Sequence, residues 1–219
     1  MSASSTQTLS LNLDISAPDS FHILPDNRAS ITFRCLQPGD QPEVKSLCHA
    51  WFPVEYPDTW YDDIAHNKKY FTLAACDRST HAIVGLIVAN VLLFAHCNYD
   101  DQKILHPSLS LNSSICYILV LGVVKEYRRQ GLASLLLDNL IQTFDQRSTC
   151  KAIYLHVLHS NRQAIEFYRS KQFQYRVHLP SYYMINGDYF DAFCFARYIN
   201  GKQRMNVSSR ALLIDVLTT

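Results

Sequence analysis

Residues 115–134 read Ile-Cys-Tyr-Ile-Leu-Val-Leu-Gly-Val-Val-Lys-Glu-Tyr-Arg-Arg-Gln-Gly-Leu-Ala-Ser, and this stretch decides the fold. Its apolar first half, 115–124, is typical of a strand buried on both faces of a parallel sheet. A basic turn follows, and apolar residues at helical spacing then predict a helix over about 130–145. Residues 151–158 are again apolar, so the pattern predicts a β-α-β unit with parallel, neighbouring strands and a right-handed crossover. The expected apolar face of the helix comprises Leu132, Leu135, Leu136, Leu140 and Phe144.

The pattern continues on both sides of this unit. Asp40-Gln-Pro-Glu43 resembles a capping box for a helix through Trp51, Asp58 is expected to cap a second short helix, and Ser160-Asn-Arg-Gln163 resembles another capping box. The polar stretch from about Asn98 to Ser114 predicts an exposed loop. Further strands are expected at 31–36, 70–76, 82–91, 172–179 and 190–199.

Charge and residue counts exclude several classes of protein. The chain has 219 residues, with 20 Lys+Arg against 19 Asp+Glu, which argues against nucleic acid as the main ligand. The six glycines form neither G-x-G-x-x-G nor a Walker pattern, so Rossmann and P-loop chemistry are disfavoured. The seven cysteines are widely spaced, so we expect reduced core residues and no metal site.

The domain boundaries follow from where periodicity begins and ends. Residues 1–29 lack periodicity and predict a disordered leader, 30–200 predict one α/β domain, and 201–219 predict a short tail. The longest apolar run has ten residues, about half of the roughly 20 that a membrane-spanning helix needs.

The turn between the first strand and helix of the β-α-β unit suits an anion such as a diphosphate. A helix amino terminus offers unpaired N–H groups, Gly131 permits close backbone approach, and Arg128 and Arg129 add positive charge. The alternative is an ordinary solvated basic turn.

Two blocks resemble the GNAT acetyltransferase superfamily. Arg128-Arg-Gln-Gly-Leu-Ala133 is similar to its R-x-x-G-x-G/A coenzyme-A loop, with Ala133 in place of the second glycine, and Asn161, Ala164, Phe167 and Tyr168 match its second block. The resemblance covers about residues 31–199. It implies the GNAT fold, a single mixed twisted sheet flanked by helices, and acetyl-CoA as co-substrate, with no metal.

Four further segments resemble the NatF family of N-terminal acetyltransferases: 52–57, 117–126, 153–158 and 179–183. This resemblance implies acetyl-CoA contacts from residues at the strand end, the basic turn and the helix after the second strand. They are Leu121, Gly122, Val123, Arg129, Gln130, Gly131, Leu132, Ala133, Ser134, Asn161, Tyr168, Arg169, Ser170 and Lys171.

Tyr117 and His156 are the candidate catalytic residues. Each lies on one face of its strand, and if those faces coincide both side chains point into one cleft. The resemblance implies His156 as the base, directly or through a water, and Tyr117 as its partner in proton transfer; which of them takes the proton stays open. Alone, a strand histidine or tyrosine is more often a packing residue.

An α-amine suits this chemistry better than a lysine side chain. With reference pKa values of about 8 and 10.4, the neutral fraction at pH 7 is about 10% for the α-amine and below about 0.1% for lysine. Oriented direct attack on the thioester then needs no covalent enzyme intermediate. The NatF resemblance implies peptides that begin with Met, such as Met-Lys or Met-Leu, as the substrates.

Prolines stiffen the loop at 52–57 and tyrosines offer an apolar wall with a polar tip, so the expected substrate-binding residues are Phe52, Pro53, Val54, Glu55, Tyr56, Tyr182 and Tyr183. The resemblance implies that Leu119 also contacts the substrate. The alternative for the loop is a turn that only holds two helices together.

By resemblance, the partners are N-terminal peptides of proteins that include membrane proteins with cytosolic N-termini, not nucleic acid. The resemblance also implies peripheral contact with the cytosolic face of the Golgi membrane, otherwise the cytosol, and a monomer or weak homodimer. Two rival functions stay open: acetylation of lysine, including histone lysine in chromatin, and a non-catalytic module that binds acyl-CoA.

Overall fold

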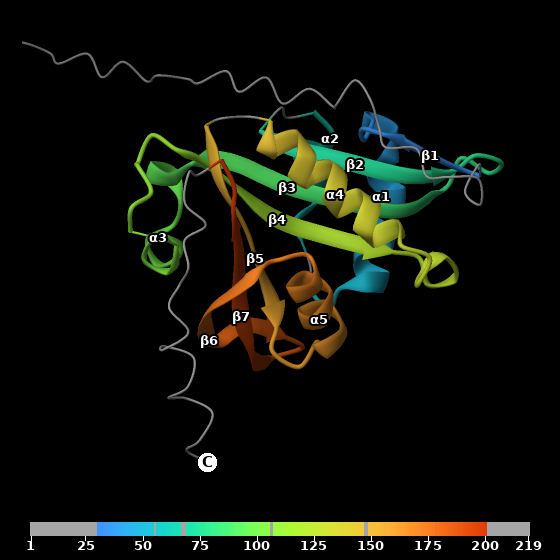
Figure 1. Cartoon of the computed structure of the whole chain (residues 1–219). Coiled ribbons are helices and arrows are strands. Elements are labelled where there is room, and N and C mark those ends of the chain that lie inside the picture. The colour runs from blue at the N-terminus through green and yellow to red at the C-terminus, as the bar shows by residue number, and fades with distance from the viewer. Residues whose placement is uncertain (1–29, 55, 67–68, 106, 147–148, 201–219) are drawn as a thin grey trace, which may run out of the picture. The chain divides into compact units, whose positions relative to one another are not determined.

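The computed structural model describes residues 30–54, 56–66, 69–105, 107–146 and 149–200 (Figure 1). The predicted leader and tail, 1–29 and 201–219, lie outside these residues. The strands are β1 (Ile31–Arg34), β2 (Tyr70–Asp77), β3 (Ile83–Leu93), β4 (Ser114–Val123), β5 (Cys150–Leu158), β6 (Gln174–Ile185) and β7 (Asp188–Tyr198). The helices are α1 (Gln41–Trp51), α2 (Asp58–His66), α3 (Tyr99–Ile104), α4 (Leu132–Asp145) and α5 (Arg162–Ser170), with 3-10 turns η1 (Pro38–Asp40), η2 (Phe94–His96) and η3 (Lys125–Tyr127).

The described strands form one mixed sheet in the order β1-β2-β3-β4-β5-β7-β6. β4 and β5 pair in parallel, whereas β1 with β2, β2 with β3, β5 with β7 and β6 with β7 pair antiparallel. The predicted β-α-β unit is therefore confirmed as β4, α4 and β5, and so is the α/β class with a single mixed sheet flanked by helices.

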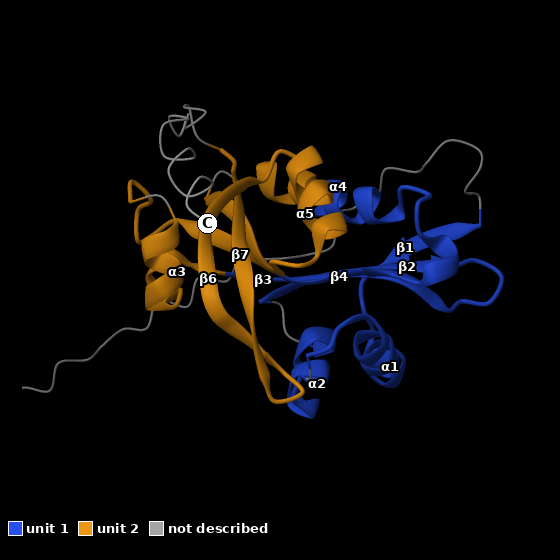
Figure 2. Ribbon diagram, turned by 90° about the horizontal axis from the view of Figure 1, so that it is seen from below, with its two compact units in different colours: residues 1–91, 118–140 blue, residues 92–117, 141–219 orange. Residues whose placement is uncertain are grey.

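The described residues form two compact units, one from 30–91 with 118–140 and the other from 92–117 with 141–200 (Figure 2). In the first unit, α1 and α2 lie on one face of the strands and α4 lies on the other (Figure 2). Gly85 of β3 lets α4 approach closely, because a Cβ there would stand 3.1 Å from Leu136 Cδ1. The core on the α1 and α2 side is built around buried side chains that include Val44, Cys48, Tyr61 and Leu86.

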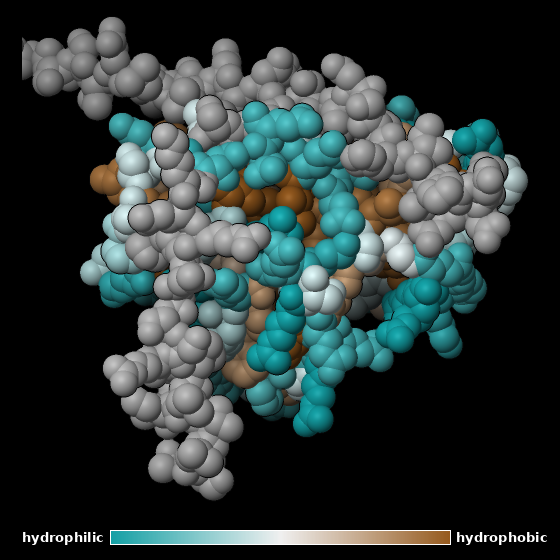
Figure 3. Space-filling model, in the orientation of Figure 1, coloured by the Kyte–Doolittle hydropathy of each residue, from teal (hydrophilic) through white to brown (hydrophobic). Residues whose placement is uncertain are grey.

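The second unit has its own core beside β5 and β7. Buried Ile115, Leu105, Tyr154 and Cys194 pack together there. Figure 3 shows that hydrophilic residues cover most of the described surface on the viewed face, with hydrophobic residues visible between them. Each fully buried side chain of this size contributes about 1.5–3 kcal/mol relative to an exposed one, so the two cores hold the strands that carry the functional side chains.

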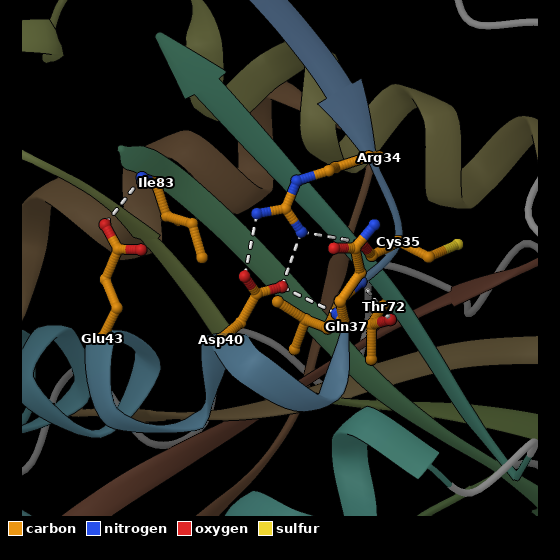
Figure 4. Close-up of polar contacts among 8 residues, drawn as sticks. Arg34, Cys35, Gln37, Asp40, Glu43, Thr72 and Ile83 are labelled. Atoms are coloured by element: carbon orange, nitrogen blue, oxygen red, sulfur yellow. Dashed lines mark hydrogen bonds and ion pairs between the residues drawn. The ribbon is translucent and has the colours of Figure 1, made fainter. Parts of the chain in front are cut away.

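The two predicted caps near the amino terminus are wrong in detail (Figure 4). Asp40 makes no side-chain cap to α1; its carboxylate instead binds the Arg34 guanidinium through contacts of 2.5 and 2.8 Å and accepts the N–H of Gln37 at 2.7 Å. Glu43 accepts the backbone N–H of Ile83 at 2.8 Å. Asp58 is the first residue of α2 and pairs with Lys45 Nζ at 2.5 Å. Asp40 and Asp58 therefore bind a charged side chain, and Glu43 binds a backbone N–H of β3, in place of capping their helices.

Two further boundaries differ from the sequence prediction. The stretch 98–114 is not only an exposed loop, because it contains α3 and the first residue of β4. The cap of α5 is Asn161, one residue later than the predicted box, and its side chain accepts the N–H of Ala164. Six of the seven cysteines are buried, and none in the described segments forms a disulfide. Within the described part of the chain, no helix has the length and apolarity to cross a bilayer.

Candidate active site

Tyr117 and His156 meet across the parallel pair of strands β4 and β5. In the register, Tyr117 lies opposite Tyr154, so His156 is two residues further along β5 and on the same face. The Tyr117 hydroxyl lies 3.1 Å from His156 Nδ1. The prediction that the two strand faces coincide is confirmed, and the pair can exchange a proton.

The His156 side chain is fully buried, with none of its surface exposed. Its other ring nitrogen, Nε2, lies 3.2 Å from Asp101 Oδ1, yet it has no aligned hydrogen-bond partner. The distance is that of an ion pair, although Nε2 forms no hydrogen bond with this oxygen. We therefore describe the contact as electrostatic: the carboxylate stabilises positive charge on the imidazole without completing a hydrogen bond.

Asp101 was missed in the sequence because it lies in the segment expected to be a loop. It is only 4% exposed and is the third residue of α3, where its N–H donates to the capping Asn98 side chain at 2.7 Å. Asn98 Nδ2 and the Tyr154 hydroxyl both donate to Asp101 Oδ2, each at 3.0 Å. The Asn98-x-x-Asp101 spacing is a capping signal that could have revealed the helix.

Tyr154 lies between this carboxylate and Tyr117. Its ring stacks on Tyr117 with centroids 4.7 Å apart, and its hydroxyl also lies 3.4 Å from Cys97 Sγ. The hydrogen bond to Asp101 holds the Tyr154 ring, and the stacking on Tyr154 in turn holds the Tyr117 ring.

Tyr182 was expected to bind substrate, and the structure places its hydroxyl 2.6 Å from His156 Nδ1. The Tyr117 and Tyr182 hydroxyls also hydrogen-bond to each other. Tyr183 packs edge-on against Tyr182, with centroids 4.9 Å apart. The hydroxyls of Tyr117 and Tyr182 and the imidazole of His156 thus form one hydrogen-bonded network.

Burial is the main cause of the shifted pKa values here. It raises the pKa of Tyr117 well above its usual value, with smaller contributions from Tyr182, Tyr183 and Asp101. Burial likewise raises the pKa of Tyr182 and, more strongly, that of Tyr154. All three phenols therefore keep their protons at neutral pH, and the Tyr154 hydroxyl donates to Asp101 Oδ2.

The residues expected to hold the diphosphate lie at the end of β4 and in the turn before α4. Arg129 and Gly131 have positive φ values of 61° and 76°, and Arg128 Nε donates to the Val123 carbonyl at 2.8 Å. The first helical bond of α4 runs from Leu135 N to Gly131 O, so the preceding N–H groups of the first turn face outward from the helix end. This arrangement fits an anion. Of the other expected residues, Gln130 lies in this turn, Leu132, Ala133 and Ser134 begin α4, and Leu121 and Gly122 lie near the end of β4.

In the second unit, the expected coenzyme residues belong to α5. Asn161 uses its amide oxygen to cap the helix at 3.1 Å from Ala164 N, so its amide nitrogen is the group that can donate to a pantetheine carbonyl. Tyr168 is buried between Phe167 and Phe173, and burial raises its pKa. The other predicted residues make structural contacts: Arg169 lies over Phe195, Ser170 Oγ donates to Phe167 O, and Lys171 O accepts from Arg197.

The predicted substrate loop 52–56 lies between α1 and α2. Tyr56 stacks on Trp60 at 4.2 Å and donates to the Leu119 carbonyl at 3.4 Å, and burial raises the Tyr56 pKa to about 12. Phe52 ends α1, with its N–H on Cys48 O, and Pro53 and Val54 follow. Glu55 lies outside the described residues. The loop therefore joins the two helices and also brings Tyr56 onto β4.

Known proteins with similar sequences are acetyltransferases. The sequence model of the Acetyltransferase (GNAT) family matches residues 42–173. N-alpha-acetyltransferase 60 of Danio rerio is 46% identical over 175 residues, covering 79% of this chain and 72% of the fish protein. Histone acetyltransferase MCC1 of Arabidopsis thaliana is 31% identical, covering 80% and 72%.

Solved structures agree. Arabidopsis thaliana NAA60 in complex with a bisubstrate analogue superposes with a TM-score of 0.72 at 29% identity, covering 78% of this chain and 99% of that one. The same enzyme in complex with acetyl-CoA gives 0.71 at 29% identity, covering 78% and 100%. This chain belongs to the GNAT acetyltransferase family.

Proposed function

We propose that this protein transfers the acetyl group of acetyl-CoA to the α-amino group of peptides that begin with Met. The observation that carries the proposal is the 3.1 Å contact between Tyr117 and His156 on neighbouring parallel strands. The N-alpha-acetyltransferase 60 relative and the acetyl-CoA complex of the Arabidopsis structure support the reaction and the co-substrate.

The residues present fit acetyl-CoA. The left-handed turn at Arg129 and Gly131 and the first N–H groups of α4 would hold the diphosphate, and Asn161 would hold the pantetheine. When bound, acetyl-CoA supplies an activated acyl carbon and a thiolate leaving group. Among the described residues, no cluster is arranged to hold a metal ion.

His156 is the base in this proposal and Tyr117 is the acid. The hydroxyl of Tyr117 keeps its proton because burial raises its pKa, so it is suited to donate toward the departing sulfur. The imidazole accepts the proton of the amine, and the carboxylate of Asp101, 3.2 Å from Nε2, stabilises the resulting imidazolium.

For the substrate, we propose that Tyr56, Leu119 and Tyr183 contact the methionine and that Phe52 lies beside the acetyl group. Tyr56 is oriented by its stack on Trp60 and by its hydrogen bond to Leu119 O. Pro53, Val54 and Glu55 complete the loop, and the negative charge of Glu55 would favour Lys at the second position.

A second candidate is lysine acetylation, which the similarity to a histone acetyltransferase favours. A Met-Lys peptide offered with a free and with a blocked amino terminus separates the two. Acetylation only of the free peptide supports our proposal, and acetylation that survives the block replaces it. If acetyl-CoA binds but no peptide is acetylated, and Tyr117→Phe and His156→Ala change nothing, the protein is a non-catalytic module.

For location and partners, we propose peripheral association with the cytosolic face of the Golgi membrane and membrane-protein N-termini as substrates, acting as a monomer or weak homodimer. Only resemblance to the NatF family supports this. Fractionation of the expressed chain tests it, and a protein found wholly in the soluble fraction overturns the membrane assignment.

A further inference from the structure

The buried imidazole of His156 cannot meet a substrate amine directly. None of its side-chain surface is exposed, and its Nδ1 faces two tyrosine hydroxyls. These two hydroxyls are therefore the protein groups in position to pass a proton to Nδ1.

Tyr182 is the better placed of the two. Its hydroxyl lies 2.6 Å from Nδ1, against 3.1 Å for Tyr117. The residue is 41% exposed, whereas Tyr117 is held between Tyr154 and the His156 ring. Tyr182 is thus accessible to a ligand, and its hydroxyl contacts the His156 imidazole.

A bulge in β6 determines where Tyr182 points. Leu179 lies opposite Ala192 and Tyr183 lies opposite Phe190, so β6 advances four residues while β7 advances two. Ser181, inside the bulge, has a φ of 52°, a conformation that non-glycine residues rarely adopt. Such bulges bend a strand and redirect a side chain.

Asp191 of β7 holds this bulge in place. Its Oδ1 accepts the N–H of Ser181 at 2.9 Å, and its Oδ2 lies 2.8 Å from His178 Nε2. Its backbone carbonyl accepts the N–H of His159 at 3.0 Å, next to the end of β5. We call Asp191 with its contacts to Ser181 and His178 the clamp. The hydrogen bond from Ser181 and the contact with His178 lower the pKa of Asp191, so the clamp is charged at neutral pH.

We propose that the Tyr182 hydroxyl relays the proton of the bound α-ammonium group to His156, and that Asp191 is the positioning residue that holds Tyr182 for this step. The inference rests on the proposed acetyl transfer to an α-amine. It changes the role of Tyr182 from a wall of the substrate pocket to a member of the proton path.

The step balances. The substrate N–H⁺ bond breaks and a bond forms from that proton to the Tyr182 oxygen, while the O–H bond of Tyr182 breaks and its proton bonds to His156 Nδ1. The products are a neutral amine and an imidazolium, so one positive charge moves inward toward the Asp101 carboxylate, and Tyr182 remains a neutral phenol.

The first test is Tyr182→Phe, which removes only the hydroxyl. We expect kcat at pH 7 to fall about a hundredfold, the lower end of the usual effect of a positioned acid or base, with KM for peptide changed by less than about threefold. Because the α-amine has a pKa of about 8, most of it is already neutral at pH 9, and the defect should shrink to about tenfold or less there. Tyr189→Phe, on the same hairpin and 67% exposed, is the matched control and should match wild type.

A structural defect would not disappear as pH rises. A fall in kcat below about threefold at pH 7, or a defect that is equal at pH 7 and pH 9, overturns the relay whatever happens to KM. If the wild-type protein itself forms no acetyl-peptide, the proposed function fails before the relay is tested.

The second test addresses the clamp. Asp191→Asn should lower kcat about tenfold at pH 7, whereas Ser181→Gly keeps the N–H and suits the positive φ, and should match wild type. In the double variant Tyr182→Phe/Asp191→Asn, kcat should equal that of Tyr182→Phe alone, because the clamp acts only through that hydroxyl. Multiplied defects in the double variant would overturn the positioning role.

Discussion

Asp101 Oδ1 lies 3.2 Å from His156 Nε2, and both side chains are almost completely buried. The carboxylate comes from a six-residue helix, and the imidazole comes from a central strand. A charge held this close in a buried setting stabilises the protonated imidazole far more than an exposed carboxylate would.

We therefore expect Asp101→Asn to lower kcat about 10- to 100-fold, with KM for acetyl-CoA nearly unchanged. The substitution keeps the shape and the acceptor for Tyr154 but removes the negative charge. Asp100→Asn, on the same helix and exposed, is the control. Steady-state kinetics measure kcat and KM for both variants. Equal kcat in the two would mean that the Asp101 carboxylate only holds α3 in place through Asn98 and Tyr154.

Gly122→Ala should destabilise the protein by about 2 kcal/mol, since overpacking commonly costs about 1–3. A Cβ at Gly122 would stand 2.1 Å from Trp51 Cε3, within the aromatic ring's own space. Gly39→Ala is the control, because no atom lies within 4 Å of its added Cβ. Urea unfolding measures both, and Gly122→Ala/Trp51→Leu should recover part of the loss. No recovery would show that the clash is not the cause.

Asn161→Asp should separate the two roles given to this residue. Asp caps helices about as well as Asn, so stability should be unchanged, but the lost amide donor should raise KM for acetyl-CoA severalfold. Asn161→Ala removes both groups and should also cost about 1 kcal/mol. Unfolding and acetyl-CoA titration are the measurements; an unchanged KM in the Asp variant would remove Asn161 from the coenzyme contacts.

Asp77 should make stability depend on pH. Hydrogen bonds from the Ser79 hydroxyl, the Thr80 N–H and the Tyr127 hydroxyl hold its pKa well below the usual range. A carboxyl with a lowered folded pKa contributes stability above its unfolded pKa, about 3.9, and that contribution declines as the pH falls below it. The urea midpoint should thus drop between pH 6 and pH 3 by less in Asp77→Asn than in wild type.

Asp188→Asn, another carboxylate removed from the surface, is the control for that experiment and should behave as wild type. An identical pH dependence in Asp77→Asn and wild type would mean that this turn does not contribute. Asp77 also accepts a hydrogen bond from Tyr127, which precedes the basic turn. Asp77→Asn should therefore also raise KM for acetyl-CoA.

The sequence was most informative where one local pattern governs the result. The apolar run 115–124, the leucine spacing of α4 and the run 151–158 predicted the β-α-β unit, because burial on both faces leaves few alternatives. The period of two assigned Tyr117 and His156 each to one face of its strand, but only the register of β4 with β5 shows that the two faces coincide.

What could not be predicted depends on partners far away in the chain. Asp101 can be buried because the hydroxyl of Tyr154, 53 residues later, donates a hydrogen bond to its carboxylate. Asp40 resembles a helix cap but binds Arg34 instead, and Tyr182 reaches His156 only because Asp191 stabilises the bulge at Ser181. No local propensity encodes these choices, since each is made by tertiary contacts.

The carboxylate beside the His156 imidazole belongs to α3, a helix of six residues between β3 and β4. A helix this short is not stable by itself and is kept by Asn98 and by the bond to Tyr154. Loss of this one turn would leave the sheet intact and the imidazole without its anion. Local unfolding of α3 should therefore abolish activity while the rest of the protein stays folded, so heat inactivation should begin at this helix.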